Sequence, residues 1–183
     1  QKAMGEAITE RDSLPVMTTL GVTTLISDSG VTRYRVNTEE WMMYDRKKPS
    51  YWAFEKGVYM EQFDSIFNVE ASIKADTAYY YDKERLWKLI GNVDIQNRKG
   101  ERFNTELLYW NEATQKVYSD KFIRIQQPDR IITGHGFDSN QQMTIYTIRN
   151  IEGIFYVDEE ASSGPPQPET KALPDSVNKD TAK

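Results

Sequence analysis

His135 is the only histidine in the chain, and histidine is the side chain best suited to general acid–base catalysis near neutral pH. It lies between Gly134 and Gly136, and no nucleophile motif accompanies it. Strand alternation would place it on the same face as Thr133 and Phe137. The flanking glycines favour a bent or bulged strand. We therefore interpret His135 as a structural residue rather than a general base.

A second possible chemistry is glycoside hydrolysis, because glycosidases act through paired carboxylates. The candidate carboxylates are Asp76, Glu106 and Asp120. Each lies on the polar face or at the end of a predicted strand. The sequence has no calcium-loop spacing, no pair of histidines and no cysteine. We predict no catalytic residue, no metal and no cofactor, and keep a carbohydrate-active enzyme as a less favoured alternative.

Four tryptophans, Trp41, Trp52, Trp87 and Trp110, could stack on sugars or lie against acyl chains. Large aromatic side chains in β-proteins also fill ordinary cores. Their types alone do not separate these two roles, so the elements that position them must decide.

Composition excludes several partners. The 28 acidic and 23 basic residues are scattered, so no basic stripe is available to follow a phosphate backbone, and we expect no nucleic acid partner. No apolar run reaches the roughly 20 residues that a membrane-spanning helix requires. At 183 residues, the chain is long enough for one domain with a sizeable core.

Apolar residues recur at every second position from Thr18 to Val157, as in residues 69–75 and 87–95. Turn sequences rich in Gly, Pro, Asn and Asp separate these runs. An apolar and a polar face on each run indicate antiparallel strands that are buried on one side. The chain is therefore predicted to be all-β.

The ends of the chain differ from this central region. Residues 1–17 are predicted to be a polar leader with a helical turn from Glu6 to Arg11, and residues 18–157 form the β domain. Residues 158–183 form an acidic, Pro-rich tail without aromatic residues, which we expect to be disordered.

A weak repeat with a spacing of 30 residues runs through the middle of the domain. Asp76 corresponds to Glu106, and Val93 corresponds to Ile123. The repeat predicts a β unit that is used more than once in an elongated structure.

Specific segments add a family resemblance to these patterns. They are residues 75–80 (ADTAYY) with 86–93 (LWKLIGNV), residues 105–110 (TELLYW) with 116–120 (KVYSD), and residues 132–138 (ITGHGFD). In type and order they resemble LptC and its relative LptA, over roughly residues 18–157.

The resemblance implies an elongated, open-ended β-jellyroll of two antiparallel sheets that binds lipopolysaccharide acyl chains in its interior. It also implies a periplasmic location, lipid received from an inner-membrane Lpt ABC transporter, and an LptA-like protein bound by edge-strand pairing. Anchoring to the inner membrane would come from an N-terminal segment absent from this sequence. A β-sandwich scaffold or cell-surface binding module without lipid transfer is the main alternative.

Strand alternation within the family region selects candidate site residues. The candidate lipid-binding groove comprises Ile73, Trp87, Leu89, Val93, Ile95, Phe103, Ile123, Ile125 and Phe137. The candidate partner-strand edges are the runs 19–27 and 143–148, represented by Val22, Thr24, Ile26, Met143, Ile145 and Tyr146.

Overall fold

A computed structural model describes residues 11–157, so the predicted tail and most of the predicted leader lie outside the described residues. Strands make up most of the described chain, which confirms the all-β prediction. In chain order they are β1 (Met17–Asp28), β2 (Val31–Tyr44), β3 (Tyr51–Phe54), β4 (Val58–Phe63), β5 (Val69–Ala75), β6 (Thr77–Tyr81), β7 (Leu86–Asn97), β8 (Arg102–Asn111), β9 (Lys116–Gln126), β10 (Arg130–Asn140) and β11 (Tyr146–Tyr156).

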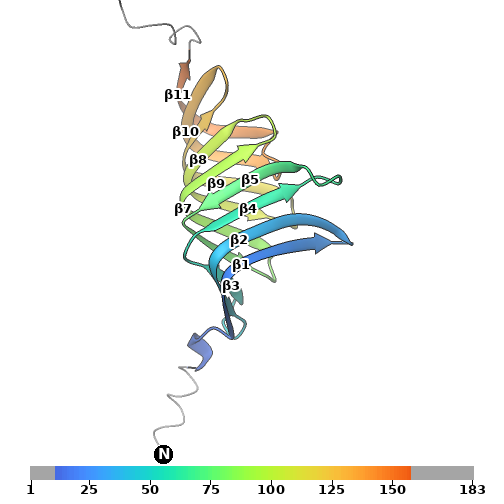
Figure 1. The fold of residues 1–183 in the computed structure, drawn as a ribbon. Coiled ribbons are helices and arrows are strands. Elements are labelled where there is room, and N and C mark those ends of the chain that lie inside the picture. The colour runs from blue at the N-terminus through green and yellow to red at the C-terminus, as the bar shows by residue number, and fades with distance from the viewer. Residues whose placement is uncertain (1–10, 158–183) are drawn as a thin grey trace, which may run out of the picture.

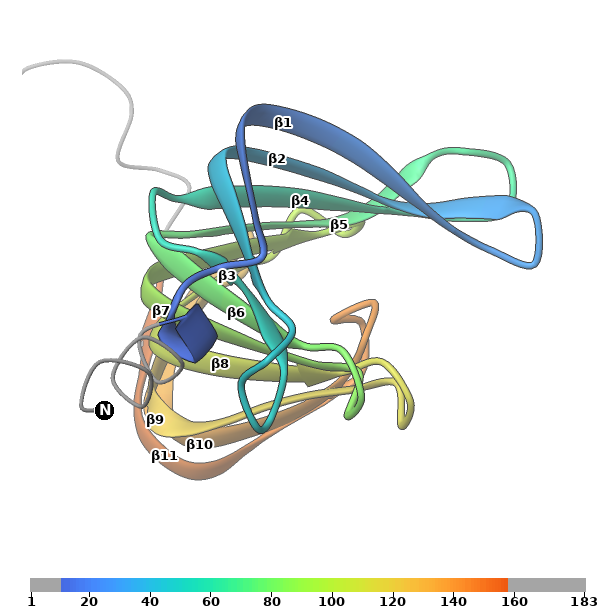
Figure 2. The same ribbon diagram turned by 90° about the horizontal axis from the view of Figure 1, so that it is seen from below.

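The strands form one continuous antiparallel sheet that is folded lengthwise into a V (Figures 1 and 2). They stack along the long axis of the molecule, with β1 and β2 toward one end and β10 and β11 at the other. The two layers of the predicted jellyroll are the two arms of this single sheet, because strands continue from one arm into the other.

Strands β2 and β7 show how the chain crosses the fold. The first half of β2 pairs with β4 and its last residues pair with β3. The first half of β7 pairs with β6 and its second half pairs with β5. We call the two layers the β4–β5 arm and the β3–β6 arm. Strands β8 to β11 pair along their length on both sides of the bend, so each contributes to both arms.

Bulges produce the bend. The pairing register shifts around Gly91 in β7 and around Gly136 in β10, and both glycines have φ of +79°. This left-handed conformation is accessible to glycine at little cost. A Cβ at Gly91 would also lie 2.9 Å from Asp76 Oδ2. The local bend predicted from Gly134 and Gly136 is therefore a β-bulge.

The space between the arms is apolar. All nine candidate groove residues are buried there, from fully buried Leu89, Ile123, Ile125 and Phe137 to Ile73 at 9% exposed. They belong to one continuous core that also contains Val36, Phe54, Met60, Leu108, Trp110 and Val117. Inward rows of successive strands therefore meet in a single interior.

The 30-residue repeat corresponds to two successive bent segments. Arg85 and Gln115, 30 residues apart, have φ values of 51° and 55° in equivalent hairpin turns. Val93 and Ile123 are both buried just past the bend. The repeat thus reflects one bent β unit used twice.

Candidate functional site

An apolar cavity of about 230 Å³ opens near the β1 end of the interior. Strands β1, β2 and β3 supply most of its walls, and β7 supplies one tryptophan. The lining residues are Val22, Thr24, Leu25, Ile26, Val36, Thr38, Trp41, Trp52, Phe54 and Trp87. The cavity therefore presents aliphatic and aromatic surface and very few polar atoms.

The aromatic residues of the cavity pack in a chain. The rings of Trp41 and Trp52 lie 4.9 Å apart, those of Trp41 and Phe54 lie 5.9 Å apart, and those of Phe54 and Trp87 lie 5.5 Å apart. The buried Nε1 of Trp41 has no hydrogen-bond partner. An oxygen atom of a bound molecule could accept a hydrogen bond from this group.

Glu112 separates the apolar cavity from polar surroundings. Its carboxylate accepts hydrogen bonds from Trp87 Nε1 at 3.0 Å and from the Tyr80 hydroxyl at 3.2 Å, and Arg85 Nε lies 3.6 Å away. Burial, reinforced by the Glu112 charge, raises the pKa of Tyr80 to about 12. Trp87 thus faces the cavity with its ring and is held in place by its N–H.

A polar mouth of about 610 Å³ lies between the edges of the two arms. Arg33, Asp64 and Glu70 line it from the β4–β5 side, and Arg85 and Glu112 line it from the β3–β6 side. Ile26 lines both the mouth and the apolar cavity. The two spaces therefore adjoin and could hold the polar and apolar parts of one amphiphile.

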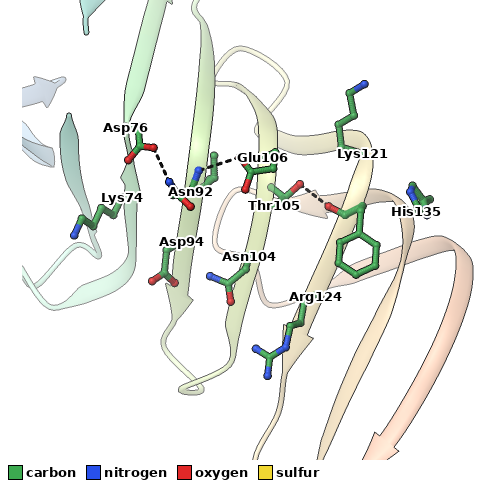
Figure 3. Close-up of a pocket in the computed structure, with 12 residues that line it drawn as sticks. Lys74, Asp76, Asn92, Asp94, Asn104, Thr105, Glu106, Lys121, Arg124 and His135 are labelled. Atoms are coloured by element: carbon green, nitrogen blue, oxygen red, sulfur yellow. Dashed lines mark hydrogen bonds between the residues drawn. The ribbon is translucent and has the colours of Figure 1, made fainter. Parts of the chain in front are cut away.

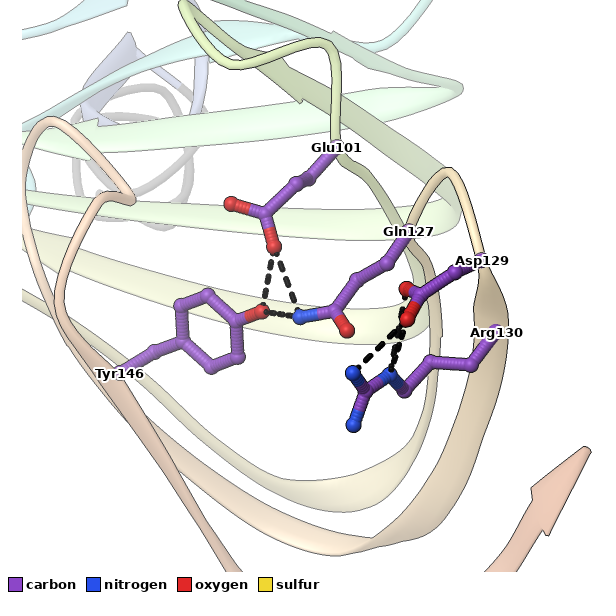
Figure 4. Close-up of polar contacts among 5 residues, drawn as sticks. All are labelled: Glu101, Gln127, Asp129, Arg130 and Tyr146. Carbon is purple, nitrogen blue, oxygen red and sulfur yellow. Dashed lines mark hydrogen bonds and ion pairs between the residues drawn. The ribbon is translucent and has the colours of Figure 1, made fainter. Parts of the chain in front are cut away.

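The arms touch at the β8–β11 end (Figure 4). The Glu101 carboxylate, 7% exposed, accepts hydrogen bonds from Tyr146 at 2.5 Å and from Asn97 and Gln127 at 2.9 Å each. Burial alone would raise the pKa of Glu101, but these three donors outweigh it and leave the pKa below its ordinary value. Burial and the Glu101 hydrogen bond raise the pKa of Tyr146 to about 12.

The sequence located the interior but not its open part. Of the nine candidate groove residues, Trp87 alone lines the apolar cavity, and the other eight lie in the packed core. Val36 and Phe54 line the cavity but were not selected as groove residues. Alternation identifies inward positions, but it carries no information on which inward positions border empty space.

The candidate edge residues near the start of the domain lie on a terminal strand of the described sheet. Val22, Thr24 and Ile26 are on β1, whose only partner among the described strands is β2. The same three side chains line the apolar cavity. Strand β1 is therefore both an edge strand of the sheet and a wall of the apolar cavity.

The candidate edge at the other end needs correction. Met143 and Ile145 lie in the loop before β11, and Tyr146 is the first residue of that strand. The Asn140 side chain accepts hydrogen bonds from the backbone N–H groups of Thr144 and Ile145, which stabilises the loop. The terminal strand is β11, which pairs with β10 alone among the described strands.

The predicted position of His135 relative to Phe137 also needs correction. The bulge at Gly136 reverses the alternation, so His135 is exposed while Phe137 is fully buried, and the two do not share a face. His135 Nδ1 lies 2.5 Å from Glu152 Oε1. Both side chains of this pair are about half exposed.

Asp76 and Glu106 border an outer hollow of about 800 Å³ at the bend (Figure 3). Asn92 holds both: its side-chain amide donates to Asp76 at 2.7 Å, and its backbone N–H donates to Glu106 at 3.3 Å. Asp120 instead pairs with Arg149 at 2.6 Å. Across residues 11–157, no three acidic or histidine side chains form a group that could hold a metal ion.

Within residues 11–157, a continuous sheet folded around an apolar interior, with an apolar cavity near one end and two terminal edge strands, defines an open-ended β-jellyroll. The sequence model of the family described as "Lipopolysaccharide-assembly, LptC-related" matches residues 15–154. The chain therefore belongs to the LptC family, whose members are periplasmic components of lipopolysaccharide export.

A search of curated proteins finds no match to the sequence. Within residues 11–157, no helix has both the length and the apolar character needed to cross a membrane.

Proposed function

We propose that the chain binds the acyl chains of lipopolysaccharide between its arms and passes the lipid from the inner-membrane Lpt ABC transporter to an LptA-like periplasmic protein. The apolar cavity beside the polar mouth carries this proposal. We further propose that the chain acts at the periplasmic side of the inner membrane.

The dimensions of the cavity support acyl-chain binding. Its volume of about 230 Å³ exceeds the roughly 150 Å³ of an engineered apolar cavity that binds benzene. Each methylene group moved from water into such a space contributes about 0.8 kcal/mol. Several methylene groups therefore supply useful affinity without any specific polar contact.

The terminal strands support strand pairing with partners at both ends. β1 and β11 each have one neighbour in the described chain, so each leaves backbone groups without a ladder partner. On β11 the exposed side chains include Ile151, Phe155 and Tyr156. An added strand would satisfy the free backbone groups and cover this apolar surface.

A charge placed in the cavity tests the proposal. Val22→Asp should lower lipopolysaccharide binding at least ten-fold, because an unpaired carboxylate beside acyl chains is costly. Thr23→Asp is the matched control, since Thr23 is the next residue of the same strand and is exposed on the opposite face. Binding is measured by co-sedimentation with lipopolysaccharide and by photo-crosslinking.

Equal binding by the wild-type chain and both variants would reject the cavity as the lipid site. A wild-type chain that binds no lipopolysaccharide would instead favour the scaffold alternative.

A further inference from the structure

Contacts between the arms at the β8–β11 end come from strand ends and loops that are far apart in the sequence. At the edge of the β4–β5 arm lie Asn97, the last residue of β7, and the loop residues Glu101 and Gln127. At the edge of the β3–β6 arm lie Met143, in the loop before β11, and Tyr146, the first residue of β11. We call these five residues the clasp. Lys99 Nζ adds a peripheral contact to the Thr144 carbonyl at 3.4 Å.

The clasp is held mainly by hydrogen bonds. Between the arms, the Tyr146 hydroxyl lies 2.5 Å from both Glu101 Oε2 and Gln127 Nε2 (Figure 4). Asn97 Nδ2 donates to the Met143 carbonyl at 2.8 Å. These separations leave no space between the two edges for another molecule.

The Tyr146 ring ties the clasp to the core. It packs edge-on against Phe103, with ring centres 5.1 Å apart, and lies 5.8 Å from Phe137. Its hydroxyl and the Glu101 carboxylate would be hydrated if the arms separated, so water can replace the bonds that the clasp loses. Such an exchange lowers the free-energy cost of separating the two edges.

The position of the clasp matters for an amphiphile. A lipid whose acyl chains lie between the arms and whose saccharide stays in water must extend through the slit between the arm edges. The polar mouth leaves that slit open beside the cavity, and the clasp closes it at the β8–β11 end. A saccharide moving toward β11 would meet the clasp.

We propose that the clasp is a gate, and that the contacts of Tyr146 with Glu101 and Gln127 must break before the saccharide-bearing lipid can pass from the cavity to the β11 end. This inference rests on the proposed function, because it assumes that lipid enters at the cavity. It assigns Tyr146 and Glu101 to control of passage rather than to lipid binding.

A removable crosslink tests the gate. The chain contains no cysteine, so Lys99→Cys with Thr144→Cys creates a unique pair across the clasp. After folding, a reductant-cleavable bismaleimide joins the two thiols. Asn104→Cys with Arg124→Cys is the matched control, because these residues face one another on β8 and β9 within one arm.

Passage is read at two positions. A photoreactive residue replaces Thr38, which lines the cavity, or Ile148, which lies on β11 against the core. The full chain is reconstituted with the inner-membrane transporter in proteoliposomes that contain lipopolysaccharide, and ATP is added. With the clasp crosslinked, the Thr38 adduct should persist while the Ile148 adduct falls at least ten-fold, and reductant should restore it.

Other outcomes separate the two proposals. An Ile148 adduct that is unchanged by the clasp crosslink would overturn the gate and leave the proposed function in place. Absence of both adducts in the uncrosslinked protein would overturn the proposed function and the gate together. Tyr146→Phe, which keeps the ring and removes the hydroxyl, should raise the ratio of Ile148 to Thr38 adduct, and an unchanged ratio also counts against the gate.

Discussion

The two ends of the folded sheet differ in how their interiors are filled. At the β8–β11 end, Phe103, Ile125 and Phe137 are at most 1% exposed and the arms meet at the clasp. At the β1 end, Trp41 and Trp52 are only partly buried and border a cavity. Both ends use the same strand alternation. The inward rows are therefore tightly packed where the arm edges touch and border a cavity where the edges are apart.

The difference also separates stability from binding. A packed interior has little tolerance for changes in volume or charge, whereas a wall that borders open space can adjust. We therefore expect substitutions at the β8–β11 end to affect mainly folding, and substitutions at the β1 end to affect mainly lipid binding.

The largest expected effect is that of a charge in the packed end. Ile125→Asp should destabilise the domain by more than about 4 kcal/mol, because it buries a carboxylate without a partner. Val22→Asp at the open end should cost less than about 1 kcal/mol, because its carboxylate can reach water. Urea unfolding followed by tryptophan fluorescence gives both values, and similar losses at the two sites would break the distinction between the ends.

A smaller effect is expected from neutralising the clasp. Glu101→Gln should cost about 1–3 kcal/mol at pH 7, because a buried charged acceptor with three donors is replaced by a neutral amide. The folded-state pKa of Glu101 lies below its ordinary value, so its stabilisation is present above that ordinary value and is lost as the pH falls through the folded-state pKa.

The stability difference between wild type and Glu101→Gln should therefore shrink when urea unfolding is repeated at successively lower pH from 7 toward 3. A difference that is constant over this range would show that the Glu101 charge does not contribute.

The smallest effect on stability is expected at the terminal edge. Ile154 and Phe155 are consecutive exposed residues of β11, so one backbone N–H faces β10 and the other faces solvent. Proline at the position whose N–H faces β10 should cost about 1–3 kcal/mol of stability, because it removes a hydrogen bond of the sheet. Proline at the position whose N–H faces solvent should cost less than about 1 kcal/mol. The more stable variant should still lose affinity for an LptA-like partner in a pull-down assay. Undiminished affinity would exclude β11 as the pairing edge.

Features set by local alternation could be predicted from the sequence. Val93, Ile95, Ile123 and Ile125 were assigned to the interior because neighbouring residues of a strand point to opposite faces, whatever the rest of the chain does. The same rule failed for His135, because one bulge residue at Gly136 reverses the alternation.

The clasp could not be predicted in this way. Asn97 and Met143 are 46 residues apart, and nothing in the sequence around either residue indicates the other. Glu101 and Gln127 look like ordinary polar loop residues. The alternating run 143–148 resembled a strand, but its first residues bind back to Asn140. Contacts between distant loops depend on the bend angle of the whole sheet, which local patterns do not determine.

The meander from β7 to β11 also bears on how the chain acquires its structure. Each of these strands pairs with the next one along the chain, so residues 86–156 have a low contact order for a β-protein. The β4–β5 arm, by contrast, requires β2 to reach past β3 to β4, and β5 to reach past β6 to β7. We expect the hairpins in the second half of the domain to form first. The strands at the β1 end then add to these hairpins, and the cavity forms last.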